Sequence, residues 1–550
     1  MTLGDRVRAW IDEDPDPRTR TSLAATLAAA EAGDATAAAE LADAFDGTLE
    51  FGTAGLRGRM GPGPNRMNLV VVARAAAGLA RYLNERGGGA VVIGHDARHD
   101  SDLFAKASAQ ILTGAGLSVM MLPAHLPTPV LAFAIRHLGC AAGVMVTASH
   151  NPPEDNGYKV YLADGCQIVP PADAQTSAHI DAVTALGPVA DLPHGSEWVT
   201  LDDDVAQAYV AKAAALVEPG PPIHLRMAYT AMHGVGGDLF VRVLEEAGFP
   251  EPVIVEAQFR PDPDFPTVAF PNPEEPGAMD LAFAAAAAAD CDIVIAHDPD
   301  ADRCAVGVPG ADGWRMLSGD EVGWLLAWWI AAGNRRVIRR CVFAQSIVSG
   351  SMLEAIARDA NIEYEQTLTG FKWIARVPDL TFGYEEALGY CVDPNGVRDK
   401  DGVTAGLMVG EMVARLKGWG TTPVEVLDDL AAQYGVHDTR QVSVRVSDLA
   451  RIDTVMSALR ANPPTSIAGV AVTTFEDLEQ GTSGLPPTDG LRFTLESGAR
   501  VIIRPSGTEP KVKCYLQTVV PVVDGDVAAA RERAATEIEA LSSDVSAWLG

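Results

Sequence analysis

The feature that most constrains the fold is a regular alternation of short apolar runs with segments of helical periodicity. It begins with an apolar run over Ala90–Gly94 and continues with helical spacing over 102–114, an apolar run over 117–122, helical spacing over 128–138 and an apolar run over 142–146. Strands that alternate with helices of about 10–15 residues are typical of βαβ units, which build a mainly parallel sheet. The pattern therefore predicts an α/β fold.

The same alternation returns twice along the chain, in architecture and not in residue identity. The second unit has apolar runs over 225–230, 252–256 and 292–296, with helices over 237–247 and 278–289. The third unit has predicted strands over 340–345 and 362–367 with a helix over 350–359. At about 100–200 residues per domain, a chain of 550 residues has room for three to five domains.

The two ends of the chain depart from this pattern. An Ala-rich segment over 20–46 is predicted to be helical. After about residue 440 the pattern indicates a strand and a helix, strands over 491–495 and 499–504, and a helix near 524–548, which predicts an α+β module with an antiparallel sheet.

Composition narrows the class of protein. The net charge of −31 and the pI of about 4.6 argue against a nucleic-acid partner and against an anionic membrane surface. The seven cysteines are scattered and the N-terminus has no apolar core of a signal peptide, so a cytoplasmic protein with reduced thiols is expected. The apolar run over 321–332 is too short to span a bilayer and is predicted as a buried helix. A phosphate-bearing substrate would need a local basic site on so acidic a chain.

Ligands of parallel sheets bind beyond the carboxyl ends of the strands, so the residues that follow each strand are the candidates. Ser149 and His150 follow the run that ends at Val146, in a turn rich in Asn, Pro and Gly, where the Ser149 hydroxyl is predicted to be exposed. An activated serine can carry a group covalently, although this loop by itself favours the alternative that Ser149 is an ordinary surface turn residue. No G-x-S-x-G elbow is present, which argues against a hydrolase triad.

Three alternating carboxylates follow the strand that ends at Ala296: Asp298, Asp300 and Asp302. Spaced carboxylates in a short loop can bind a hard cation, and a helix-capping cluster is the alternative. A calcium loop needs Gly at its sixth position and Glu at its twelfth, where this chain has Arg303 and Pro309. Mg²⁺, which accepts a few carboxylates together with phosphate oxygens, is therefore the preferred ion.

Two further loops carry polar groups suited to a sugar phosphate. Glu385 and Glu386 are adjacent carboxylates able to accept hydrogen bonds from sugar hydroxyls, although a solvated acidic turn explains them equally well. The segment from Arg504 to Lys511 contains a guanidinium, hydroxyls, free backbone N–H groups around a glycine and an ammonium, which together suit a phosphate. The alternative for that segment is an ordinary hairpin exit.

Together, and in this order, the four loops resemble those of the α-D-phosphohexomutase superfamily, the phosphoglucomutases and phosphomannomutases. The resemblance covers essentially the whole chain. It implies three related α/β domains with mainly parallel βαβ units and a C-terminal α+β domain, arranged around a central cleft. The implied domains are residues 1–205 for the phosphoserine, 206–318 for the metal, 319–438 for the sugar and 439–550 for the phosphate.

The resemblance also implies a role for each candidate residue. Ser149 resembles the phosphoserine, and Asp298, Asp300 and Asp302, with an oxygen of that phosphoserine, resemble the Mg²⁺ ligands. The other residues that resemble catalytic groups are Arg57, His150 and Lys159, the last as general acid/base if burial lowers its pKa. Those that resemble substrate-binding groups are Arg303, Gly370, Lys372, Glu385, Glu386, Arg504, Ser506, Gly507, Thr508 and Lys511.

The implied reaction moves a phosphoryl group between two hydroxyls of a sugar phosphate through a sugar 1,6-bisphosphate, which also serves as activator. A hexose is expected, glucose before mannose. Ala387 stands where many phosphoglucomutases have Ser, and the Tyr-Glu-Glu-Ala form is similar to a branch with phosphopentomutases and a glucose 1,6-bisphosphate synthase. Those two activities, and more distantly an inactive sugar-phosphate-binding protein, are the alternatives.

Overall fold

The computed structural model describes residues 1–218, 224–311, 313–334, 340–445, 449–481, 484–505 and 511–549. The chain forms two compact units. The first comprises Met1–Met316 with Gly389–Ala414, and the second comprises Leu317–Leu388 with Arg415–Gly550.

Three helices open the chain: α1 (Leu3–Glu13), α2 (Pro17–Glu31) and α3 (Ala35–Ala44). The helical segment predicted over 20–46 is present but is divided between α2 and α3. Gly33 adopts a φ of 96°, in the left-handed region that ends helices. The Asp34 side chain then accepts the N–H groups of Thr36 and Ala37, so it caps a new helix.

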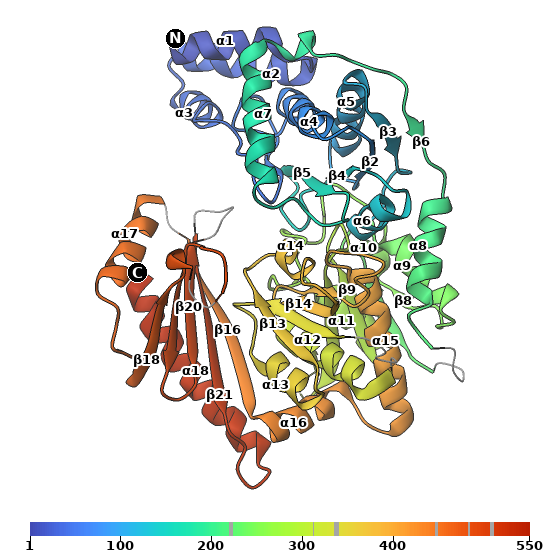
Figure 1. The fold of residues 1–550 in the computed structure, drawn as a ribbon, viewed down its shortest axis with the longest axis vertical. Helices are drawn as coiled ribbons and strands as arrows, with labels where there is room; N and C mark the ends of the chain where they lie inside the picture. The colour runs from blue at the N-terminus through green and yellow to red at the C-terminus, as the bar shows by residue number, and fades with distance from the viewer. Residues whose placement is uncertain are drawn as a thin grey trace. The chain divides into compact units, whose positions relative to one another are not determined.

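The first sheet has the strand order β1-β5-β4-β2-β3-β6. Its central strand β2 pairs in parallel with β3 and β4, whereas β5 runs antiparallel to both β4 and β1. The strands are β1 (Leu56–Arg59), β2 (Ala90–His95), β3 (Ser118–Met121), β4 (Ala142–Val146), β5 (Asp155–Leu162) and β6 (Val199–Thr200). The helices beside them are α4 (Leu69–Asn84), α5 (Ser101–Gly114), α6 (Thr128–His137) and α7 (Ala172–Leu186) (Figure 1).

The second sheet has the order β11-β10-β9-β7-β8. β7 pairs in parallel with β8 and β9, and β10 runs antiparallel to β9 and β11. The strands are β7 (Met227–Thr230), β8 (Val253–Ile254), β9 (Ile293–His297), β10 (Cys304–Gly310) and β11 (Gly313–Met316). The helices are α8 (Asp204–Ala214), α9 (Gly237–Glu246), α10 (Glu256–Phe259) and α11 (Asp280–Ala288). After β15 (Gly389–Cys391), the chain enters α15 (Gly402–Trp419).

The second unit contains a parallel sheet and an antiparallel one. In the parallel sheet β12 (Val342–Ser346) lies between β13 (Glu363–Thr367) and β14 (Leu380–Glu385). Its helices are α12 (Gly319–Trp329), α13 (Met352–Asp359), α14 (Phe371–Ile374) and α16 (Pro423–Tyr434). The predicted buried helix over 321–332 is α12, in which Trp324 and Trp329 are buried.

The antiparallel sheet has the order β16-β21-β20-β19-β18-β17. Its strands are β16 (Val436–Arg445), β17 (Ser466–Ile467), β18 (Val470–Asp477), β19 (Leu491–Leu495), β20 (Arg500–Pro505) and β21 (Lys511–Val520), and its helices are α17 (Leu449–Ala461) and α18 (Val527–Leu549) (Figure 1). The predicted fold class, α/β domains followed by a C-terminal α+β domain, is confirmed. The four domain boundaries stay a prediction.

Two expectations from the sequence concern the cysteines and membrane-spanning helices. All seven cysteines lie in the described part of the chain and all are free thiols. Among the helices of the described ranges, none combines the length and the apolar character that crossing a bilayer requires.

Candidate active site

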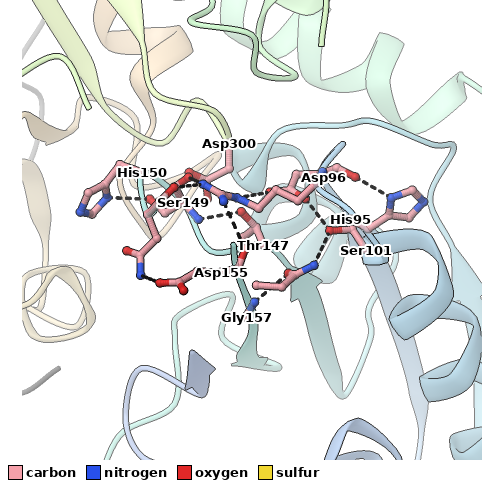
Figure 2. A network of polar contacts seen from close by, with 12 residues as sticks. His95, Asp96, Ser101, Thr147, Ser149, His150, Asp155, Gly157 and Asp300 are labelled. Atoms are coloured by element: carbon pink, nitrogen blue, oxygen red, sulfur yellow. Dashed lines mark hydrogen bonds and ion pairs between the residues drawn. The ribbon is translucent and has the colours of Figure 1, made fainter. Parts of the chain in front are cut away.

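Ser149 lies in the turn of an antiparallel hairpin formed by β4 and β5 (Figure 2). The backbone of Ser149 has a φ of 55°, and its N–H donates to Thr147 Oγ1 at 2.9 Å. The prediction that the hydroxyl is exposed is wrong, because Ser149 is only 3% exposed. Its Oγ donates to Asp298 Oδ2 at 2.9 Å and lies 3.2 Å from His150 Nδ1. The serine is thus held between a carboxylate and an imidazole.

Arg98 fixes the backbone of this turn, a role that the sequence analysis did not identify. Its Nη2 donates to the carbonyl oxygens of Ser149 at 2.6 Å and Asn151 at 2.5 Å, and its Nη1 donates to that of Pro152 at 2.8 Å. The guanidinium is 1% exposed and lies 3.4 Å from the Asp96 carboxylate, which balances its charge. The available signal was its position directly after β2, at the carboxyl end of a parallel strand.

The three predicted metal ligands lie together between β9 and β10. Asp298, Asp300 and Asp302 are each at most 1% exposed, and each offers one carboxylate oxygen within 4.8 Å of the others. Ala301 has a φ of 53°, which turns the chain so that alternate side chains converge. Three buried carboxylates this close repel one another, so the cluster needs positive charge to remain ionised.

Part of that charge comes from two lysines. Lys159 Nζ donates to Asp300 Oδ2 at 2.6 Å and to Asp302 Oδ2 at 2.9 Å. Lys400 Nζ lies 3.2 Å from Asp302 Oδ2, a contact that the sequence analysis missed because it joins distant segments. The two cations leave the cluster incompletely neutralised, since burial, followed by the charges of Asp300 and Asp302, raises the pKa of Asp298 well above its usual range.

The cluster fits a divalent cation. The Oδ1 atoms of Asp300 and Asp302 are buried, and among the described residues neither has a hydrogen-bond partner. An unsatisfied buried oxygen is costly unless something coordinates it. Two such oxygens, beside a third carboxylate whose pKa is raised, are the donor set expected for a hard cation.

The pKa of Lys159 is not lowered, as its predicted role as general acid/base required. Burial does favour the neutral amine, but the charges of Asp300 and Asp302 outweigh it and raise the pKa of Lys159. Lys159 is therefore an ammonium group in this arrangement. The predicted acid/base role depended on a pKa lowered by burial, and the sequence did not show that the two carboxylates are neighbours of Lys159.

Three further predicted residues lie at the same site. Arg57, on the edge strand β1, donates from Nη1 to Asn151 Oδ1 at 3.3 Å. Burial, followed by the charges of Arg303 and Arg57, lowers the pKa of His150 well below its usual range, so its ring is neutral at pH 7. The backbone N–H of Arg303 donates to Asp298 Oδ1 at 3.0 Å. The structure thus places the predicted carrier, metal ligands and catalytic residues together in the first unit.

The remaining predicted residues belong to the second unit. Glu385 ends β14 and is buried, and Glu386 follows it. The Glu386 carboxylate accepts hydrogen bonds from Ser346 Oγ at 3.1 Å and Ser349 Oγ at 2.9 Å. Burial, followed by the charge of Glu385, raises the pKa of Glu386 to about 7. Glu386 is thus a partly buried acid held by hydroxyls, not the solvated turn residue of the alternative.

Gly370 and Lys372 stand at the start of the short helix α14, where Gly370 has a φ of 111° that favours glycine. Arg504 lies on β20, opposite Lys513 of β21. Lys511 is the first residue of β21. Ser506, Gly507 and Thr508 lie outside the described residues, so of the residues predicted to bind this phosphate only Arg504 and Lys511 are described.

The ionisation of Glu386 gives a prediction for stability. A carboxyl whose folded pKa is raised stabilises the fold while protonated, so this contribution is present below about pH 4.5 and is lost as pH rises through about 7. The free energy of unfolding of Glu386→Gln, relative to that of the wild type, should therefore increase by on the order of 1–3 kcal/mol from pH 5 to pH 8. Urea unfolding of both proteins at the two pH values measures this gain. An unfolding free-energy difference that does not change with pH would contradict it.

Comparison with known proteins matches the chain to four family domains in order. They are the phosphoglucomutase/phosphomannomutase alpha/beta/alpha domains I (residues 48–186), II (207–311) and III (318–434) and the C-terminal domain (442–534). The helices α1, α2 and α3 precede the first matched residue.

Individual relatives and a solved structure carry the names of the same family. A "probable phosphomannomutase" from Haemophilus influenzae is 49% identical over 455 residues, which cover 82% of this chain and 92% of the relative. A phosphoglucomutase from Staphylococcus aureus is 34% identical over 521 residues, covering 89% and 93% of the two chains. A crystal structure of a phosphoglucomutase/phosphomannomutase family protein from Burkholderia thailandensis has a TM-score of 0.68 at 22% identity, covers 89% of this chain and 97% of its own, and has the same fold.

Proposed function

Because this chain belongs to the phosphoglucomutase/phosphomannomutase family, and is therefore an intramolecular phosphotransferase of the isomerase class, we propose that it interconverts a hexose 1-phosphate and a hexose 6-phosphate. We place glucose first and mannose second, and we place the reaction in the cytoplasm. The observation that supports this proposal most is the contact between Ser149 Oγ and Asp298 Oδ2, which puts a nucleophilic hydroxyl at the edge of a carboxylate cluster suited to Mg²⁺.

In the proposed reaction, phosphorylated Ser149 gives its phosphoryl group to the free hydroxyl of a sugar phosphate. The resulting 1,6-bisphosphate turns around and returns its other phosphoryl group to Ser149. Asp298, Asp300 and Asp302 would hold Mg²⁺, which when bound offsets the negative charge of the phosphoryl group. Phosphoryl transfer demands little else of a protein than positioning and charge stabilisation.

The residues around Ser149 suit these demands. Arg98 holds the backbone of the turn through three carbonyl groups, so the serine is positioned before substrate binds. Neutral His150 can accept a proton near Ser149 Oγ, and the Lys159 ammonium can donate one. Arg57 supplies a guanidinium for a phosphate oxygen.

The substrate is tested by measuring turnover with the 1-phosphates of glucose, mannose, ribose and deoxyribose, each with a catalytic amount of the matching bisphosphate. We expect the two hexoses to give the highest kcat/KM. A higher value for a pentose would replace this proposal with a phosphopentomutase. Net accumulation of glucose 1,6-bisphosphate from a phosphoryl donor, without isomerisation, would replace it with a bisphosphate synthase.

We propose that Arg504 grips whichever phosphate is not reacting. It is the one guanidinium of its segment and can bind a phosphate through two N–H groups. Arg504→Ala should lower kcat/KM for both monophosphates about tenfold or more, since a charge-assisted hydrogen bond contributes about 1.5–3 kcal/mol. Steady-state kinetics in both directions measure the loss.

The matched control is Arg440→Ala. Arg440 lies on the same antiparallel sheet, and its guanidinium pairs with Glu539. The control should keep normal kinetics. If Arg504→Ala lowers only the melting temperature and leaves both kcat/KM values unchanged, Arg504 supports the hairpin and does not bind phosphate.

A further inference from the structure

Thr128 is a buried threonine that contacts the carboxylate cluster and has no assigned role. It is the first residue of α6 and is fully buried, with 0% exposure. Its Oγ1 donates to Asp300 Oδ2 at 2.5 Å, and its backbone N–H donates to the carbonyl oxygen of Asp300 at 3.0 Å. One residue thus holds both the side chain and the backbone of Asp300, although 172 positions separate the two in the chain.

The local sequence makes this contact rigid. Thr128 stands between Pro127 and Pro129, whose rings restrict the backbone at the start of α6. The β-branched side chain of threonine adds few rotamers. The N-cap residue of α6 is Pro127, and no side chain caps the start of this helix by a hydrogen bond. The Thr128 hydroxyl is therefore not used as a helix cap. It donates to Asp300 instead, so the hydroxyl binds the carboxylate and not the helix.

The contact determines which oxygen of Asp300 is available. Oδ2 receives two donors, Thr128 Oγ1 and Lys159 Nζ at 2.6 Å. Oδ1 is buried and has no hydrogen-bond partner among the described residues. A carboxylate fixed through one oxygen by two donors cannot rotate freely, so its other oxygen keeps a constant direction.

We infer that Thr128 is a positioning residue for the metal site: it fixes the Asp300 carboxylate through Oδ2 so that Oδ1 is presented to the cation. This inference rests on the proposed role of the three aspartates as Mg²⁺ ligands. Partners that orient metal ligands in this way change metal affinity or activity by about 10–100-fold when they are removed.

The test measures Mg²⁺ binding directly. Full-length enzyme is stripped with a chelator and titrated with MgCl₂ by calorimetry, and the melting temperature is recorded with and without Mg²⁺. Thr128→Val keeps the shape and removes the hydroxyl, and it should raise the Kd for Mg²⁺ by about 10–100-fold. Thr128→Ser keeps the hydroxyl and should retain an affinity close to that of the wild type.

The matched control is Thr176→Val. Thr176 is also a fully buried threonine of the first unit, but its Oγ1 donates to the carbonyl oxygen of Ala172 within α7. The control should lose stability without losing Mg²⁺ affinity. If Thr128→Val does not fold, the Kd for Mg²⁺ of Thr128→Ala is compared with that of Thr128→Ser, which again measures the effect of the hydroxyl.

Asp300→Asn separates this inference from the proposed function. If Asp300→Asn abolishes Mg²⁺ binding while Thr128→Val binds as the wild type does, the aspartates are metal ligands and Thr128 does not position them. If Asp300→Asn itself leaves Mg²⁺ affinity unchanged, the proposed metal site is wrong and the inference is overturned with it. If Thr128→Val binds Mg²⁺ more weakly and Thr128→Ser binds it as the wild type does, the result supports both the metal site and the positioning role of Thr128.

Discussion

Ser149→Ala should abolish mutase turnover, with a loss on the order of 10⁴-fold or more, because alanine has no hydroxyl to carry the phosphoryl group covalently. Ser149 Oγ is held by Asp298 at 2.9 Å and lies 3.2 Å from His150, in a turn whose backbone Arg98 fixes independently of the side chain. The variant should therefore keep its fold. A coupled assay measures the loss, and intact-mass analysis should find one phosphate on the active wild type and none on the variant.

The control for this variant is Ser108→Ala. Ser108 is likewise fully buried in the first unit, where its Oγ donates to the carbonyl oxygen of Phe104 in α5. Its removal should lower stability and leave turnover intact. Full turnover by Ser149→Ala, or a phosphate that maps to another residue, would refute the role of Ser149.

Removal of the metal should have an effect of similar size. Within the described ranges, two buried carboxylate oxygens of the cluster have no hydrogen-bond partner, and the pKa of Asp298 is raised by burial and by its two neighbours. EDTA should therefore inactivate the enzyme. Mg²⁺ should restore the rate better than Ca²⁺, since Ca²⁺ is larger and takes more ligands at longer distances.

Turnover measured after dialysis against EDTA, and then with increasing concentrations of each ion, tests this expectation. Asp298→Asn provides the companion measurement, because it should remain inactive at any Mg²⁺ concentration. An unchanged rate after chelation would mean that Asp298, Asp300 and Asp302 have a structural role.

Features that depend on local sequence could be predicted. The alternation of strands and helices repeats within short windows, and for that reason Ala90–Gly94, 142–146 and 491–495 were identified as strands and 128–138 as a helix. Spacing within one loop also sufficed to group Asp298, Asp300 and Asp302. The division of 20–46 into two helices also has a local cause, since Gly33 and Asp34 carry the signal for a break between α2 and α3.

Features that depend on contacts between distant segments could not be predicted. The hydrogen bond of Ser149 and the raised pKa of Lys159 both involve aspartates that lie 141–149 positions away in the chain. A pKa depends on solvent exposure and on charges within a few ångströms, and a sequence states neither. The contacts of Arg98, Lys400 and Thr128 also join segments that are distant in the chain, and they were not predicted. The sequence therefore determined which groups this protein can use, and the tertiary structure decided which of them are charged, buried and in contact.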